Sequence, residues 1–215
     1  MFPLSSVLFP YMPLRLRVFE QRYLTMLSYL LQREPSEFGV VLIERGQEVG
    51  GEKQQRFSIG TVAQIAQLEA AEGFLSVVAE GERRIEVTEW LEGAAYPRAT
   101  VRVREPLVWD EELRPLRDRA EKVVRRSLAL ASEFGDQRWS ATVELSDEPV
   151  PAAWQLAAIA PLGPLDQVAL LASETMKELL ESVIERSLAA ADGFSAGAGV
   201  TDDPDWSAEL DNLGD

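Results

Sequence analysis

The chain has 215 residues, enough for one full hydrophobic core. It contains no cysteine, which excludes disulfides, thiolate nucleophiles and the usual structural zinc sites, and no histidine, which excludes the commonest general base. Its formal net charge of -15 repels the phosphate backbone of nucleic acids, which are therefore poor partners. It has no apolar run of about 18 residues that could span a membrane, and early prolines argue against a signal peptide, so we expect a cytoplasmic protein without a membrane partner.

In the first part of the chain, residue patterns predict short strands and one early helix. The elements follow in the order strand 4–9, loop 10–13, helix 18–33, strand 38–43 and polar loop 45–56. Pro10 and Pro13 remove hydrogen-bond donors and so end the first strand. Apolar residues at helical spacing indicate the helix, and Pro35 ends it because proline disfavours the α conformation at the residue before it.

The strongest β pattern lies between residues 57 and 105. Alternation with a period of two predicts a strand from 57, a turn at 70–73 and a returning strand, and Gly73 can supply the positive φ of a tight hairpin. Another strand is predicted to begin after Gly81, and a last one covers 97–105. The apolar residues predicted to point inward on that last strand are Ala99, Val101 and Val103. Together these strands predict a small antiparallel barrel or curled sheet.

From residue 110 the pattern becomes helical. Helices are predicted over 115–134, 151–160, 165–172 and 175–190. The last begins with Thr175 and Glu178 at the spacing of a capping box. Residues 195–215 hold six carboxylates and no Lys or Arg, so they are predicted to be a disordered acidic tail. The chain is therefore divided into a β-barrel subdomain (1–109), a helical subdomain (110–194) and the tail.

The strings IGTVAQI (59–65) and VAEGERR (78–84), with Gly73 between them, resemble the N-terminal domain of the ATP-dependent Lon proteases. That family has a Gly-Thr-x-Ala-x-Ile strand, a turn and a Gly-x-x-Arg segment. Two further blocks agree in order, FPLSSVLFP (2–10) near the start and DQVALL (166–171) in the helical part. The resemblance covers about residues 1–190.

The resemblance implies an α+β fold in which a PUA-like antiparallel β pseudobarrel with one early helix is followed by a C-terminal helical bundle. It also assigns structural roles to five residues of the shared motifs, namely Pro10, Gly60, Thr61, Gly81 and Arg84. The residues themselves support this for Gly60 and Gly81, because a glycine within or at the end of a strand usually marks a bulge or a close backbone approach. In the Arg83-Arg84 pair, we expect one side chain to be exposed and the other to brace a carboxylate such as Glu80 or Glu82.

No catalytic, cofactor or metal site is predicted. Lon proteases hydrolyse ATP in one separate module and cleave peptides with a Ser-Lys pair in another, and this sequence contains no Gly-x-x-x-x-Gly-Lys-Ser/Thr loop. Its three lysines, Lys53, Lys122 and Lys177, fall on a polar loop and on solvated helix faces, where burial does not lower the pKa of an amine. Adjacent carboxylates likewise lack the enclosed pocket that would separate their pKa values.

Aromatic and methionine side chains are the candidates for a binding surface. The candidate peptide-binding residues are Tyr11, Met12, Trp90 and Trp109. Trp139 belongs to the same group, while Trp154, on an apolar helix, is predicted to fill the core. The resemblance implies a non-catalytic domain that binds unfolded or hydrophobic polypeptide, or another protein, at the first loop and the barrel-helix groove, with the tail as a competitor for that groove. Weak self-association is left open.

Two alternatives come from other classes of protein. An RNA-binding PUA-like module would need a basic face, for which Arg98, Arg102 and Arg104 on one strand are the local candidates. A small-molecule enzyme would have to use only Asp, Glu and Arg, and would need a deep pocket lined by paired carboxylates.

Overall fold

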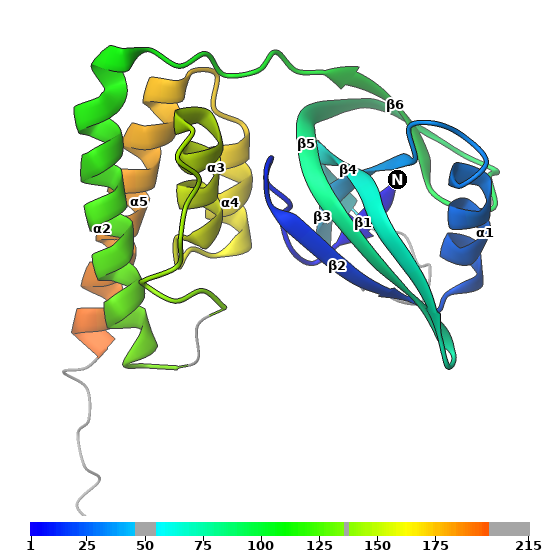
Figure 1. Cartoon of the computed structure of the whole chain (residues 1–215), viewed down its shortest axis with the longest axis horizontal. Helices are drawn as coiled ribbons and strands as arrows, with labels where there is room; N and C mark the ends of the chain where they lie inside the picture. Colours follow the sequence, from blue (N-terminus) through cyan, green and yellow to red (C-terminus); the bar gives the residue numbers. More distant parts are fainter. Residues whose placement is uncertain (46–54, 136–137, 198–215) are drawn as a thin grey trace, which may run out of the picture.

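The structure is a computed structural model that describes residues 1–45, 55–135 and 138–197. A β unit with one helix lies on one side of the molecule and a helical unit on the other, and the connection from residue 104 to 110 joins them at the top of Figure 1. In the β unit the elements are β1 (Phe2–Leu4), β2 (Pro13–Val18), α1 (Gln21–Leu30), β3 (Glu37–Arg45), β4 (Gln55–Ala71), β5 (Phe74–Leu91) and β6 (Arg98–Val103). The helical unit contains the short 3-10 helix Glu111–Leu113, α2 (Arg114–Ser132), α3 (Pro149–Ile159), α4 (Pro164–Leu171) and α5 (Met176–Gly197).

Strand β5 organises the sheet. It pairs with β4 along one edge, while its other edge is shared by β2 near its start and β6 near its end. The full order among the described residues is β1-β3-β4-β5-β2 with β6 on β5, and of these pairs β1-β3 is parallel and the others are antiparallel. The hairpin between β4 and β5 turns at Gly73 with φ 82, as predicted. The mixed α+β fold is thus confirmed, and the PUA-like pseudobarrel remains a prediction.

The predicted order of elements near the N-terminus is wrong in two places. Strand β1 ends at Leu4, and residues 5–12 form a connection in which Leu8 and Phe9 enter the core without forming a strand. The six-residue strand β2 was missed, and α1 begins at Gln21 rather than at residue 18. Pairing with β5 explains the difference, because its register places Leu14 opposite Ala79 and Val18 opposite Leu75 on a buried face. This long-range partner outweighs the local helical spacing.

Two predictions about the later strands also need correction. The strand predicted to begin after Gly81 is the continuation of β5, which runs without interruption for 18 residues. Val101 and Val103 were predicted to point inward, yet the two residues are 38% and 54% exposed. Both valines pair with buried residues of β5, Val101 with Val87 and Val103 with Ile85, so alternation identifies their face correctly but not how far that face is covered.

The four predicted helices are confirmed within a few residues at their starts. Helix α5 is longer than expected, since it continues to Gly197 instead of ending near 190 and so includes the first residues of the predicted tail. The cap of α5 is close to the expected box: the Glu178 N–H donates to Thr175 Oγ1 over 3.1 Å, and the Glu178 carboxylate accepts from the N–H of Glu174 over 2.8 Å. The remaining tail (198–215) and most of the predicted polar loop (46–54) lie outside the described residues.

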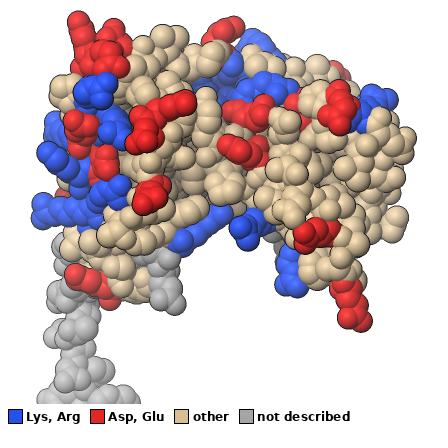
Figure 2. Space-filling view, viewed as in Figure 1, with Lys and Arg blue, Asp and Glu red and all other residues tan. Residues whose placement is uncertain are grey.

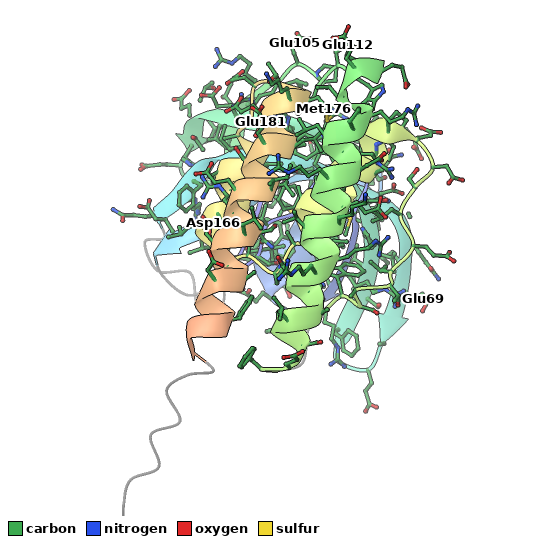
Figure 3. The ribbon with its side chains drawn as sticks, turned by 90° about the vertical axis from the view of Figure 1, so that its left-hand side faces the viewer. Glu69, Glu105, Glu112, Asp166, Met176 and Glu181 are labelled. Carbon is green, nitrogen blue, oxygen red and sulfur yellow. The ribbon has the colours of Figure 1, made fainter. Side chains whose placement is uncertain are left out.

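Helices α2 and α5 run parallel and side by side, in front of the sheet in the view of Figure 3. The Ser127 hydroxyl donates to the carbonyl oxygen of Ser187 over 2.8 Å, and the rings of Phe134 and Phe194 stack 6.2 Å apart. Figure 3 places Glu105 and Glu112 at the end where the connection enters α2, and Glu69 near the hairpin tip at the other end. None of the helices in the described part of the chain is long and apolar enough to span a membrane.

The N-terminal amine predicts a pH dependence of stability for a chain that begins at Met1. Burial, then the charges of Arg56 and Arg98, lower the pKa of this amine from 8.0 to about 5 while it donates to the Pro97 carbonyl oxygen over 2.9 Å. Between pH 5 and 8 the unfolded chain therefore binds more protons, so the free energy of unfolding should rise with pH through this window, by an amount on the order of a few kcal/mol.

Urea unfolding at several pH values between 5.5 and 8 measures this rise. The interpretation is simple because the chain has no histidine to titrate in the same range. An N-terminally acetylated chain is the control and should show a flat profile. Equal slopes for the two chains would contradict the prediction.

Candidate functional site

The segment from residue 5 to 12, called the crossing segment, packs against the β4-β5 hairpin at Gly81 and Thr61. The N–H of Tyr11 donates to the Gly81 carbonyl oxygen over 2.7 Å, and the N–H of Gly81 donates to the Met12 carbonyl oxygen over 2.9 Å. A Cβ at Gly81 would lie 2.1 Å from the carbonyl oxygen of Phe9, so only glycine allows this approach. The Thr61 hydroxyl, fully buried, donates to the carbonyl oxygen of Leu8 over 2.6 Å.

Gly60, on β4 beside Thr61, makes a similar close approach within the sheet. A Cβ at this position would lie 2.1 Å from the carbonyl oxygen of Val40 on β3. Pro10 is buried in the crossing segment. The motif residues therefore lie at close contacts, Thr61 and Gly81 with the crossing segment and Gly60 between β4 and β3.

Arg84 joins the sheet to the helices. It lies opposite Thr61 in the β4-β5 register, and only 4% of its surface is exposed. Its Nη1 donates to the carbonyl oxygens of Leu171 (2.9 Å) and Ser173 (2.6 Å), and its Nη2 donates to that of Glu105 (3.0 Å). Burial, followed by the charge of Arg104, lowers the pKa of this guanidinium to about 10, so it stays protonated at neutral pH.

The expectation for the Arg83-Arg84 pair is therefore only half right. Arg83, with 40% of its side chain exposed, forms ion pairs with Glu37 at 2.6 Å and with Glu82 at 3.6 Å. Arg84 braces no carboxylate and instead binds backbone carbonyl groups. Sequence reasoning missed this because two of these carbonyls lie in the helical unit, far along the chain.

A second arginine binds the same end of α4. Arg104 donates from Nη2 to the carbonyl oxygen of Ala172 over 3.2 Å and to the carboxylate of Glu174. The last carbonyl groups of a helix carry partial negative charge, so two guanidinium groups stabilise this end. Arg102 pairs with Glu86 on the neighbouring strand. Two of the three arginines that the RNA hypothesis requires are thus already paired with carboxylates.

Two pockets lie in the seam between the sheet and the helices, and both use the crossing segment and α3 as walls. The first, called the Leu162 pocket, has a volume of about 370 Å³. Its apolar lining includes Val7, Leu8, Phe9, Met12, Leu128, Trp139, Ile159, Leu162 and Phe194. The second, called the Arg84 pocket, has a volume of about 560 Å³. Its lining includes Pro10, Tyr11, Arg83, Arg84, Val103, Arg104, Leu107, Val150 and Trp154.

The structure brings two of the four candidate binding residues to this seam. Tyr11, 40% exposed and at φ 60, lines the Arg84 pocket, while Met12 is buried and lines the Leu162 pocket. Trp90 and Trp109 line neither pocket. The guanidinium of Arg56 lies 4.3 Å from the Trp90 ring centroid, and the Trp109 Nε1 donates to the Glu111 carboxylate over 3.0 Å.

Trp154 is buried, as predicted, and lies between the two parts of the molecule. The centroid of its ring lies 6.1 Å from the centroid of the Phe9 ring. The Arg84 guanidinium carbon lies 5.1 Å from the same Trp154 centroid. The pocket residues missed by sequence reasoning are Val103, Leu107, Leu128, Val150, Ile159, Leu162 and Phe194. They come from separate elements, so no local spacing could have grouped them. Among the described residues, no cluster of acidic side chains suited to a metal ion occurs.

The fold and the seam define a class of protein, a domain in which a curled sheet with one helix packs on a helical unit through buried arginine contacts. The family model of the ATP-dependent protease La (LON) substrate-binding domain matches residues 1–186, and the chain belongs to this family.

Solved structures agree with this assignment. The Lon N-terminal domain protein from Xanthomonas campestris is 26% identical, with a TM-score of 0.60 over 86% of this chain and 95% of that chain. The N-terminal domain of the Mycobacterium avium complex Lon protease shows the same fold at 18% identity, with a TM-score of 0.59 over 86% of this chain and 96% of that chain. A search of curated proteins found no match.

Proposed function

We propose that this chain is a non-catalytic recognition domain of the cytoplasm that binds exposed apolar segments of unfolded polypeptide in the seam. The observation that carries the proposal is the pair of pockets that both have the crossing segment as a wall. Family membership supports polypeptide as the ligand, because the matching family is described as a substrate-binding domain.

The Leu162 pocket fits an apolar side chain of a client. Side chains from the crossing segment, α2 and α3 line it, and apolar groups face it from several directions. Full burial of one Leu or Phe side chain contributes about 1.5–3 kcal/mol, so one or two such side chains correspond to dissociation constants from roughly tens of millimolar to tens of micromolar. Binding of this strength is reversible, which suits a domain that samples many clients.

The RNA-binding alternative has less support. Arg102 and Arg104 are engaged with Glu86 and Glu174, and Figure 2 shows acidic and basic side chains interleaved on the visible face. A strand whose cations already have carboxylate partners attracts phosphate weakly. An enzyme built from Asp, Glu and Arg is not favoured by any observation on the described residues.

Replacing Leu162 with aspartate tests the proposed function. This side chain lines the pocket and is partly buried, so a carboxylate there should weaken the binding of a fluorescently labelled, permanently unfolded polypeptide at least about tenfold, because an apolar client group would then meet a charge. Fluorescence anisotropy measures the affinity, and circular dichroism verifies the fold.

The matched control is Leu165→Asp. Leu165 is three residues further along, is 68% exposed and does not line the pocket, so this substitution should leave the affinity unchanged. Equal affinities for both variants would remove the Leu162 pocket from the proposal. No binding by the unsubstituted protein would overturn the proposed function itself.

A further inference from the structure

The Arg84 pocket contains a buried cation without a carboxylate partner. Among the described residues, Arg84 forms no ion pair, whereas its neighbours Arg83 and Arg104 pair with Glu37 and Glu174. Three backbone carbonyl oxygens accept its hydrogen bonds, and the carboxylates of Glu174 and Glu178 stabilise its charge without direct contact. Buried charges in proteins are normally paired, so this guanidinium suits an anion that arrives with a ligand.

Arg84 also has donors to spare. A guanidinium carries five N–H donors, and its three hydrogen bonds use three of them. Among the described residues, Nε and one N–H of Nη2 donate no hydrogen bond, and Arg84 lines the pocket. A carboxylate oxygen is the acceptor that matches such donors best.

Part of the lining of the Arg84 pocket is apolar. Leu107, Val150 and Trp154 contribute it, with the Trp154 ring 5.1 Å from the Arg84 guanidinium carbon, and the volume of about 560 Å³ lies within the usual range for small ligands. At the rim, Glu80 and Glu82 disfavour a ligand that carries several negative charges. The pocket therefore fits a ligand that carries one carboxylate and one apolar group close together.

We propose that the Arg84 pocket binds the C-terminal residue of a polypeptide, with its α-carboxylate on Arg84 and its apolar side chain against Trp154. A C-terminal residue carries both groups on a single Cα, and capture of a terminal carboxylate is a recurring mode of peptide recognition. The inference rests on the proposed function and names the part of the client that the second pocket recognises.

A pair of peptides tests the carboxylate. The probe is a labelled, unstructured ten-residue peptide that ends in leucine, used with a free C-terminus and as the C-terminal amide, against the full chain. The free acid should bind at least about tenfold more tightly, because the amide cannot supply the negative charge. A third peptide, amidated and with an internal glutamate, distinguishes the terminal carboxylate from a side-chain carboxylate.

A charge at the pocket mouth gives an independent test. Val103 lines the pocket and is 54% exposed, so Val103→Glu should reduce the affinity for the free acid several-fold and change that for the amide less. Val108→Glu is the matched control, since Val108 is 81% exposed and does not line this pocket. It should leave both affinities unchanged.

The outcomes separate this inference from the proposed function. Equal affinities for acid and amide, or equal effects of the two glutamate variants, overturn the C-terminal site. Tight binding of the internal-glutamate amide assigns the pocket to side-chain carboxylates and overturns it as well. If the unfolded polypeptide binds while neither ten-residue peptide does, the inference fails and the proposed function stands. If the polypeptide does not bind either, both fail.

Discussion

Replacing Arg84 with methionine is expected to lower the free energy of unfolding by about 3–5 kcal/mol. Methionine keeps most of the apolar stem but removes all donors, so the carbonyl oxygens of Leu171, Ser173 and Glu105 lose their partner in a buried place. Hydrogen bonds to a charged group are worth more than neutral ones, and unsatisfied buried acceptors add a desolvation penalty. Urea unfolding followed by circular dichroism measures the loss.

The adjacent arginine provides the control. Arg83→Met removes an equal charge from the same strand, but the ion pair with Glu37 is partly solvated and 40% of the Arg83 side chain is exposed. The expected loss is below about 1 kcal/mol. Losses of similar size for the two variants would show that Arg84 does not join the two parts of the molecule.

Gly81→Ala is expected to cost about 3 kcal/mol, at the upper end of the usual range for overpacking. The added Cβ would lie 2.1 Å from the backbone oxygen of Phe9, and backbone cannot move aside as a flexible side chain does. Separation of the two segments would also stretch the two hydrogen bonds that Gly81 forms with Tyr11 and Met12. The midpoint of urea unfolding reports the change.

Gly193→Ala is the comparison for this prediction. Gly193 lies in α5, and an added Cβ would meet nothing within 4 Å. Alanine is the better helix former, so this variant should gain about 0.5–1 kcal/mol. A loss for Gly81→Ala no greater than a few tenths of a kcal/mol would mean that the crossing segment moves freely away from β5.

Arg84→Met and Gly81→Ala change neighbouring positions of β5, where the crossing segment, the hairpin and the end of α4 meet. The two pockets share that segment as a wall, so the contacts that hold the sheet to the helices also shape the proposed binding surface. We therefore expect ligand binding to stabilise the fold, since a ligand that binds only the native chain shifts the unfolding equilibrium.

Sequence patterns succeed here where the signal is local. The β4-β5 hairpin is read from a period of two and from Gly73, and the helices of the second unit from spacing near 3.6 residues and from the Thr175 cap. Each of these signals lies within one element. The family motif adds to them, because its residues are contiguous in the chain.

Predictions failed where a partner far along the chain decides the outcome. β2 is a strand because β5 lies beside it, and Val103 is exposed although its cross-strand partner Ile85 is buried. Trp90 and Trp109 looked like binding residues by type, yet they do not line the seam pockets. No spacing reports which aromatic side chains share a cavity, since that depends on how the elements pack.

The amino-acid sequence by itself determined the family, the α+β class and nearly every helix, because these depend on short-range periodicity and contiguous motifs. Only the tertiary structure decided that Arg84 donates hydrogen bonds to the end of α4 and that the crossing segment is a wall of two pockets. The physical reason is that a buried guanidinium takes whichever acceptors the packing of distant elements presents to it, and a pocket exists only as the space those elements leave between them.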